Sequence, residues 1–191
     1  MEGRRVGLLG GSFNPAHEGH VHASLLALRR LHLDCVWWLV SPQNPLKSSR
    51  GMAPSASRLV QARSIAHDRR ILVTDIETEL GTVYTADTLA ALKRKFPRTH
   101  FVWLMGSDNL LQLPRWRRWQ SILRLVPVAV VNRPGSALKA RSSEAAGKFA
   151  RYFCPADGRF ALRKPPALTI LDARRNAQSA TSLRRKSGIS P

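Results

Sequence analysis

The chain has 191 residues, of which 43% are hydrophobic, so it fits one domain with a buried core and is not disordered throughout. Two cysteines exclude a disulfide scaffold and a four-cysteine zinc site, and the lack of a long apolar run or a signal peptide predicts a cytoplasmic protein without a membrane span. The formal net charge of +19, from 31 basic and 12 acidic residues, favours anionic partners but by itself identifies none.

Predicted strands and helices alternate along the chain. Short apolar runs indicate buried strands, and apolar residues at helical spacing indicate helices. In chain order we predict a strand at 6–10, a helix over 19–31, a strand over 35–40, a loop over 43–54, a helix over 57–67, a strand at 71–73, a helix from Thr85 to Phe96, a strand at 101–105 and a strand over 126–131. Thr85 is the expected cap of its helix. Residues 134–166 are polar and basic in places, with one further helix expected over 143–153.

This alternation predicts the α/β class, with a Rossmann-like doubly wound parallel sheet in a single domain, residues 1–191. Ligands of such sheets bind at the carboxyl ends of the strands, near the point where the strand order reverses. The residues that follow the strand at 6–10 and those that follow the strand at 101–105 both fall at such ends.

The segment from Gly10 to His20, GGSFNPAHEGH, carries most of the recognisable chemistry. Glycines let backbone N–H groups approach an anion, and the helix that follows points its positive end to the same place. His17 and His20 share one face of a first helical turn, where two imidazoles can donate to a phosphate and stabilise charge in a transition state. Two incidental histidines, or a two-histidine metal site, remain alternatives, although no third ligand stands at suggestive spacing. The segment is neither a Gly-x-Gly-x-x-Gly motif nor a P-loop.

This segment resembles the Gly-x-Phe-x-Pro…His-x-Gly-His signature of the nucleotidylyltransferase superfamily. In that superfamily two histidines hold the ATP phosphates during attack on the α-phosphorus, and the resemblance implies this role for His17 and His20. It also implies an ATP site that includes Gly10, Gly11, Ser12 and Phe13. Asn14 departs from the pattern, because many relatives carry Asp there.

Three further blocks narrow the resemblance to bacterial nicotinate-nucleotide adenylyltransferases. Residues 77–89 resemble the Glu-Leu…Tyr-Thr-x-Asp-Thr-Leu block of that family, and residues 106–116 resemble its Gly-x-Asp…Leu-x-x-Trp block. Residues 179–184 resemble its Ser-Ser-Thr-x-Ile-Arg ending. The blocks span residues 6–184 in family order, and the specific one is the stretch that begins at Tyr84.

The resemblance implies binding roles for these blocks. Gly106 and Asp108 would contact the adenosine of ATP, since glycine admits a flat ring and a carboxylate accepts from ribose hydroxyls. The ATP phosphates would also lie on a short C-terminal segment, residues 178–191, through Ser179, Thr181, Ser182 and Arg184. The acceptor nucleotide would contact Ser12, Lys47, Tyr84, Thr85, Trp116 and Arg117.

Structural alternatives accompany these roles. Asp108 taken alone is more typical of a helix N-cap, Trp116 of half-buried packing, and residues 179–184 of a disordered basic tail. Lys47 stands where relatives usually carry a basic pair, and the chain ends soon after Arg184, where many relatives continue into another helix.

The implied reaction transfers AMP from ATP to nicotinate mononucleotide and yields nicotinate adenine dinucleotide and pyrophosphate. The acceptor phosphate attacks in line, so catalysis rests on positioning and electrostatics. His17, His20, Lys47 and Arg184 would offset the developing charge. Mg²⁺ would bridge the ATP phosphates and water with few protein ligands, and no residue of the chain is assigned to it.

The sequence is also compatible with two other hypotheses. Another adenylyltransferase of the superfamily, with nicotinamide mononucleotide or phosphopantetheine as acceptor, would share the first block but lack the stretch that begins at Tyr84. A nucleic-acid-binding protein is the alternative from a different class, because residues 109–191 hold 17 basic and 3 acidic residues. We expect such binding to be non-specific at most. The sequence leaves the oligomeric state open.

Overall fold

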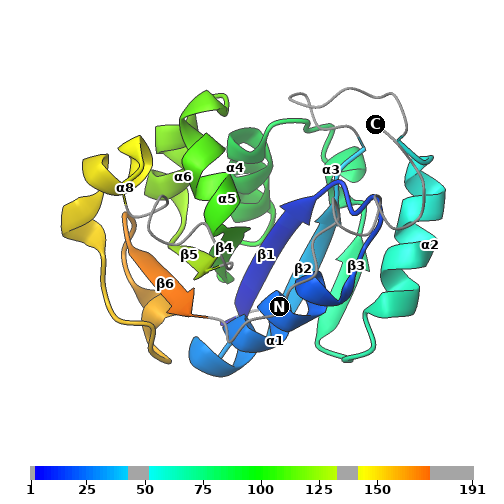
Figure 1. Ribbon diagram of the computed structural model, residues 1–191, viewed down its shortest axis with the longest axis horizontal. Coiled ribbons are helices and arrows are strands. Elements are labelled where there is room, and N and C mark those ends of the chain that lie inside the picture. Colours follow the sequence, from blue (N-terminus) through cyan, green and yellow to red (C-terminus); the bar gives the residue numbers. More distant parts are fainter. Residues whose placement is uncertain (1–2, 43–51, 133–141, 173–191) are drawn as a thin grey trace.

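The computed structural model describes residues 3–42, 52–132 and 142–172. Six strands form one parallel sheet in the order β3-β2-β1-β4-β5-β6 (Figure 1). The strands are β1 (Arg5–Gly11), β2 (Cys35–Val40), β3 (Ile71–Thr74), β4 (His100–Gly106), β5 (Val128–Asn132) and β6 (Leu168–Asp172). Because the strand order reverses between β1 and β4, this is the doubly wound sheet that the sequence predicts.

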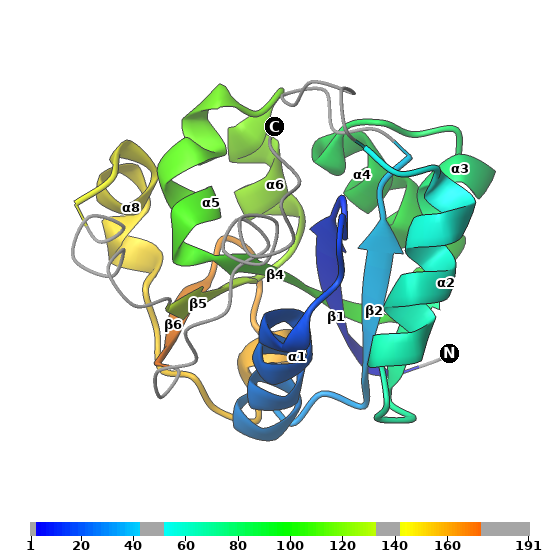
Figure 2. The same ribbon diagram turned by 45° about the vertical axis from the view of Figure 1, so that its right-hand side comes forward.

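Helices connect the strands and cover both faces of the sheet (Figures 1 and 2). They are α1 (Glu18–Arg30), α2 (Ser55–Ile65), α3 (Ile76–Glu79), α4 (Thr85–Lys95), α5 (Ser107–Gln112), α6 (Trp119–Leu125) and α8 (Glu144–Lys148). Short 3-10 turns lie at Leu113–Arg115, Ala150–Tyr152 and Phe160–Leu162. Within the described ranges, no helix has the length and apolar character needed to cross a membrane.

Two hydrophobic cores lie on the two faces because successive side chains of a strand point in opposite directions. Leu8 of β1 faces the core that includes Leu89 of α4 and Ile122 of α6. Leu9 faces the other core, which includes Leu28 of α1. Continuous apolar runs such as Cys35–Val40 are buried on both faces, as a central parallel strand requires.

The predicted boundaries need a few corrections. Thr85 is not the cap of α4: Tyr84 takes the cap position in an extended conformation, and Thr85 is the first helical residue. The helix predicted over 143–153 divides, because α8 ends at Lys148 and a 3-10 turn follows. The strand predicted from residue 126 begins at Val128, since Pro127 has no N–H for the ladder. The predicted loop over 43–54 lies mostly outside the described residues.

Candidate active site

Two histidines begin α1 at the carboxyl end of β1. His17 is the N-cap, and its Nδ1 accepts the backbone N–H of Gly19 at 3.0 Å. The Nδ1 of His20 accepts the backbone N–H of His17 at 3.2 Å, and the two ring centroids are 3.9 Å apart. Because each Nδ1 acts as an acceptor, the neutral rings carry their protons on Nε2. The pair is therefore arranged to donate hydrogen bonds from Nε2, which suits an anion.

An aromatic stack supports His20. Phe13 is 2% exposed and stacks on Trp38, with ring centroids 5.0 Å apart and an interplanar angle of 20°. The Phe13 ring also lies 4.7 Å from the His20 ring. Trp38 Nε1 donates to Ser24 Oγ at 2.8 Å, and that hydroxyl donates to the carbonyl oxygen of His20 at 2.8 Å. The Phe13 side chain thus packs against His20 and supports its position, and the predicted role of Phe13 in ATP binding remains a prediction.

The space available for a side chain differs between Gly10 and Gly11, the two glycines that precede this stack. A Cβ atom on Gly10 would lie 2.5 Å from the Trp103 ring, so packing alone requires glycine there. A Cβ on Gly11 would lie 3.5 Å from the Phe13 ring, which is ordinary contact. The sequence interpretation gave both glycines the single task of opening the backbone to an anion; at Gly10 the structure adds a packing reason.

The segment with Gly106 and Asp108, predicted to contact adenosine, lies beside the histidine loop, residues 12–17 between β1 and α1. This is because β1 and β4 are hydrogen-bonded neighbours, with Leu9 opposite Leu104. Gly106 ends β4 and is the N-cap of α5, while Asp108 lies in the first turn of that helix. The alternative that Asp108 is itself an N-cap is therefore wrong. The structure brings both loops to the edge of the sheet where the strand order reverses.

Four of the six predicted acceptor-binding residues (Tyr84, Thr85, Trp116 and Arg117) come from two segments that the fold places side by side. The Arg117 guanidinium lies over the Tyr84 ring, 4.7 Å from its centroid, and Arg118 forms an ion pair with Asp87 of α4. Thr85 lies in the first turn of α4, where backbone N–H groups have no acceptor within the helix. Trp116 is half-buried against the core, as the packing alternative expects, and its predicted contact with the acceptor remains a prediction.

Five predicted site residues have no described position. Lys47 falls in the range 43–51, and Ser179, Thr181, Ser182 and Arg184 fall in the range 173–191, both outside the described residues. Their roles remain predictions from the sequence.

Two buried ionisable residues near the site have no role predicted from the sequence. Arg58 of α2 is 1% exposed, and Glu77 of α3 is 6% exposed. Burial raises the pKa of Glu77 to about 7, although hydrogen bonds from Thr88 and Ser41 oppose the shift. The sequence pattern does not predict burial at either position, because charged side chains are normally expected on the solvated face of a helix. Glu77 did stand in the block that resembles the adenylyltransferases, where no role was assigned to it.

The chemistry of the described site suits an anion better than a metal ion. Across residues 3–42, 52–132 and 142–172, no three His, Cys, Asp or Glu side chains gather into a metal-binding group. The groups contributed by the histidine loop are N–H donors, which bind phosphate oxygens rather than cations.

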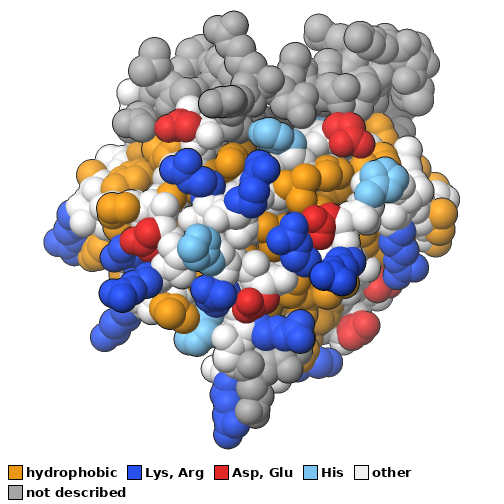
Figure 3. Space-filling model, turned by 90° about the horizontal axis from the view of Figure 1, so that it is seen from below, with side chains coloured by type: hydrophobic (Ala, Val, Ile, Leu, Met, Phe, Trp, Pro, Cys, Tyr) orange, Lys and Arg blue, Asp and Glu red, His pale blue; other side chains and the backbone are white. Residues whose placement is uncertain are grey.

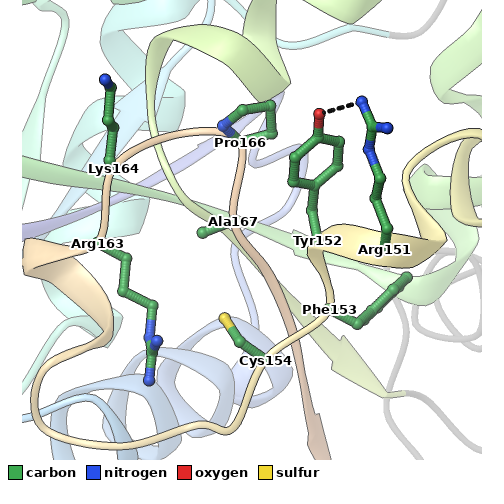
Figure 4. A pocket seen from close by; sticks show the side chains of 8 residues that line it. All are labelled: Arg151, Tyr152, Phe153, Cys154, Arg163, Lys164, Pro166 and Ala167. Atoms are coloured by element: carbon green, nitrogen blue, oxygen red, sulfur yellow. Dashed lines mark hydrogen bonds between the residues drawn. The ribbon is translucent and has the colours of Figure 1, made fainter.

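A separate cleft of about 460 Å³ lies at the start of β6, lined by Arg151, Tyr152, Phe153, Cys154, Arg163, Lys164, Pro166 and Ala167 (Figure 4). Its cationic groups do not converge: Lys164 and Arg163 point in opposite directions, Arg163 pairs with Asp157, and Arg151 donates to the Tyr152 hydroxyl. This cleft contains none of the predicted site residues.

The described face shown in Figure 3 gives no separate support for nucleic-acid binding. On this face, Lys and Arg side chains are interspersed with acidic, histidine and hydrophobic ones and form no continuous stripe. A backbone-tracking groove needs a continuous positive stripe, often with aromatic side chains between the cations.

Comparisons with known proteins show which sequences this chain is similar to. The family model described as cytidylyltransferase-like matches residues 8–186. A probable nicotinate-nucleotide adenylyltransferase of Parvibaculum lavamentivorans is 56% identical over 98% of this chain and 94% of its own length. A protein of Cereibacter sphaeroides with the same description is 54% identical over 94% of this chain and 96% of its own length.

A solved structure shows the same fold. The nicotinic acid mononucleotide adenylyltransferase of Plasmodium falciparum, complexed with NaAD, has a TM-score of 0.69 at 17% identity, covering 95% of this chain and 83% of its own. At that identity the likeness shows the fold alone, and it confirms the predicted Rossmann-like α/β class.

Proposed function

Since the chain belongs to the cytidylyltransferase-like family and, within it, to the nicotinate-nucleotide adenylyltransferases, we propose that it transfers AMP from ATP to nicotinate mononucleotide. The products are nicotinate adenine dinucleotide and pyrophosphate, as in NAD biosynthesis. The observation in the structure that carries the assignment to residues is the His17–His20 pair, with both Nδ1 atoms accepting backbone N–H groups at a helix start.

In the proposed mechanism, the phosphate of the mononucleotide attacks the α-phosphorus of ATP and pyrophosphate leaves. No side chain of the protein acts as the nucleophile. The Nε2–H groups of His17 and His20 donate to phosphate oxygens, and the amide end of α1 adds positive potential at the same point. Lys47 and Arg184 supply further positive charge in this proposal, and Ser179, Thr181 and Ser182 hold phosphate oxygens.

The two remaining groups of residues orient the nucleotides. Gly106, at the end of the strand next to the histidine loop, and Asp108, in the first turn of α5, are assigned to the base and ribose of ATP. The acceptor ring is assigned to the place where Tyr84 and Thr85 meet Arg117. An Arg beside backbone N–H donors favours a carboxylate on that ring over an amide.

Mg²⁺ enters this proposal as part of the substrate, bound to ATP. Its ligands would be phosphate oxygens and water, since the described part of the site offers N–H donors and no clustered carboxylates. The ion neutralises phosphate charge when bound, while the protein holds the phosphates in line. We also place the protein in the cytoplasm, where its thiols, Cys35 and Cys154, would remain reduced.

A pyrophosphate-release assay tests the function. The purified protein, ATP and Mg²⁺ are incubated separately with nicotinate mononucleotide, nicotinamide mononucleotide and phosphopantetheine, and the dinucleotide product is identified by mass spectrometry. We expect nicotinate mononucleotide to be the best acceptor. Faster release with phosphopantetheine, or none with any acceptor, would contradict the proposal.

A further inference from the structure

A buried arginine joins two segments at the carboxyl ends of neighbouring strands. The Arg58 guanidinium donates four hydrogen bonds, all to backbone carbonyl oxygens. One acceptor is Ser12 in the histidine loop, at 2.6 Å, and two are in the segment after β2, namely Ser41 at 2.8 Å and Pro42 at 3.0 Å. The fourth is Ala53 at 2.9 Å, just before α2. Arg58 thus fixes the spacing between the histidine loop and the segment after β2.

A buried carboxyl group holds the same segment from its other side. The Ser41 side chain lies within hydrogen-bonding reach of Glu77, where it opposes the rise in the pKa of the carboxyl group. The other partner of Glu77 is the Thr88 hydroxyl of α4, at 3.1 Å, for which the Thr82 hydroxyl at 3.0 Å and the carbonyl oxygen of Tyr84 at 3.3 Å are alternative acceptors. Glu77 therefore connects Ser41 to the turn that begins α4, where the acceptor ring is assigned.

Together these contacts form one polar chain beneath the substrate sites. It runs from Ser12 through Arg58 to Ser41, and from Ser41 through Glu77 to the turn at Tyr84. Apolar side chains fill a core at lower desolvation cost than ionisable ones, so packing alone does not account for Arg58 and Glu77. An in-line transfer between two bound nucleotides needs the two binding loops at a fixed separation, because small displacements of reacting groups reduce the rate strongly.

We propose that Arg58 and Glu77 are positioning residues that act through Ser41. They hold the histidine loop and the turn at Tyr84 at the separation that nucleotidyl transfer requires. The proposal rests on the proposed function, since it assigns a task to these residues in that reaction. Neither residue contacts substrate in it. Their effect is on the alignment of the bound nucleotides, and so on kcat.

Variants at Ser41 and Glu77 test the link. Ser41→Ala removes the hydroxyl and keeps the carbonyl that Arg58 binds, while Glu77→Leu removes both contacts of the carboxyl group. Glu77→Gln keeps an oxygen for Thr88 and gains an N–H for Ser41. The matched control is Ser57→Ala, an exposed serine on α2.

We expect Ser41→Ala and Glu77→Leu to lower kcat about tenfold or more with an unchanged KM for ATP, as for misaligned reacting groups. Glu77→Gln and Ser57→Ala should stay within about threefold of wild type, the scale of a preserved contact. Thermal unfolding of each variant separates misalignment from loss of fold. The double variant Ser41→Ala/Glu77→Leu should lose no more than Glu77→Leu alone, because both changes break one link. If Glu77→Leu does not fold, Ser41→Ala alone decides.

Arg58→Lys tests the other half of the chain of contacts, with Arg63→Lys on the exposed side of α2 as its control. A lysine keeps the charge but cannot reach four carbonyl oxygens with one fixed fork, so kcat should fall and the control should not change. Normal kcat in a folded Ser41→Ala variant, or effects that multiply in the double variant, would overturn the proposal. A wild-type protein that prefers another acceptor refutes only the proposed function, since the same variants are then assayed with that acceptor. A wild-type protein without nucleotidyl transfer overturns both.

Discussion

The Nδ1 of His20 accepts the backbone N–H of His17 at 3.2 Å, while the two imidazole rings lie 3.9 Å apart. The same contact closes the reciprocal cap of α1, in which His17 Nδ1 accepts from Gly19. The helix cap and the proposed phosphate contact thus use opposite sides of the same rings: Nδ1 stabilises the helix start, and Nε2 carries the hydrogen that the proposal assigns to phosphate.

His20→Ala should lower kcat by about a hundred- to thousandfold, because one donor to the charge of the transition state is worth about 3–4 kcal/mol. ATP binding should weaken far less. Steady-state kinetics with both substrates varied measure the two effects, and His22→Ala on the same helix is the matched control. A variant whose kcat lies within threefold of the wild-type value would contradict a catalytic role for His20.

Arg117→Ala should raise the KM for the mononucleotide acceptor about tenfold, since a charge-assisted contact is worth about 1.5–3 kcal/mol. The KM for ATP should stay the same, because Arg117 lies over Tyr84 and not at the histidine loop. Arg124→Ala, an exposed arginine of α6, serves as control. Equal effects of the two substitutions would mean that general positive charge, rather than Arg117, attracts the acceptor.

Glu77 makes stability depend on pH in a defined direction. Its pKa rises from 4.5 to about 7 on folding, chiefly because burial disfavours the carboxylate. At pH values below about 4.5 the carboxyl group is protonated in both the folded and the unfolded chain, so its ionisation does not affect the free energy of unfolding. Between pH 4.5 and 7 the unfolded chain loses its proton first, so the free energy of unfolding falls as pH rises, by about 3 kcal/mol in total.

Glu77→Gln removes this titration. Denaturant unfolding of both proteins from pH 4.5 to pH 8 measures their free energies of unfolding. The value for the variant should rise relative to that of the wild type as pH increases, and the difference should level off above pH 7. A constant difference over that range would show that Glu77 keeps an ordinary pKa.

Arg184→Ala tests a prediction that comes from the sequence alone. One charge-assisted phosphate contact is worth about 1.5–3 kcal/mol, so the KM for ATP should rise or kcat should fall at least about tenfold. Replacing Lys139 and Arg141, which belong to no motif, should change little. Equal losses in the two variants would indicate diffuse electrostatics instead of a phosphate site at residues 179–184.

The sequence predicts much of the fold because its physical signals are local. Runs such as Cys35–Val40 are apolar throughout, which only a strand buried on both faces tolerates, and the strand is found with those bounds. The reversal between β1 and β4 then places Gly10 and Gly106 at one edge, as expected for a doubly wound sheet. Cap geometry was less predictable, since Tyr84, not Thr85, takes the cap position.

The buried polar contacts are the part that sequence patterns do not predict. Arg58 stands in an ordinary helical segment, and only tertiary structure shows that backbone carbonyls from distant residues surround its guanidinium. The same holds for Phe13, predicted within the ATP site, whose side chain is buried on Trp38. Periodicity reports which face of an element is apolar, and it carries no information about hydrogen-bond partners far away in the chain.

The most direct test of the account is competition between nicotinate and nicotinamide mononucleotides at fixed ATP. The acceptors differ by a carboxylate against an amide, and this group is assigned to the place where the first turn of α4 meets Arg117. Donors there pair with a carboxylate but leave the amide NH₂ unpaired, a difference of about 3 kcal/mol. We predict at least about a hundredfold higher kcat/KM for nicotinate mononucleotide. Equal use of both acceptors, or preference for the amide, would contradict the assignment.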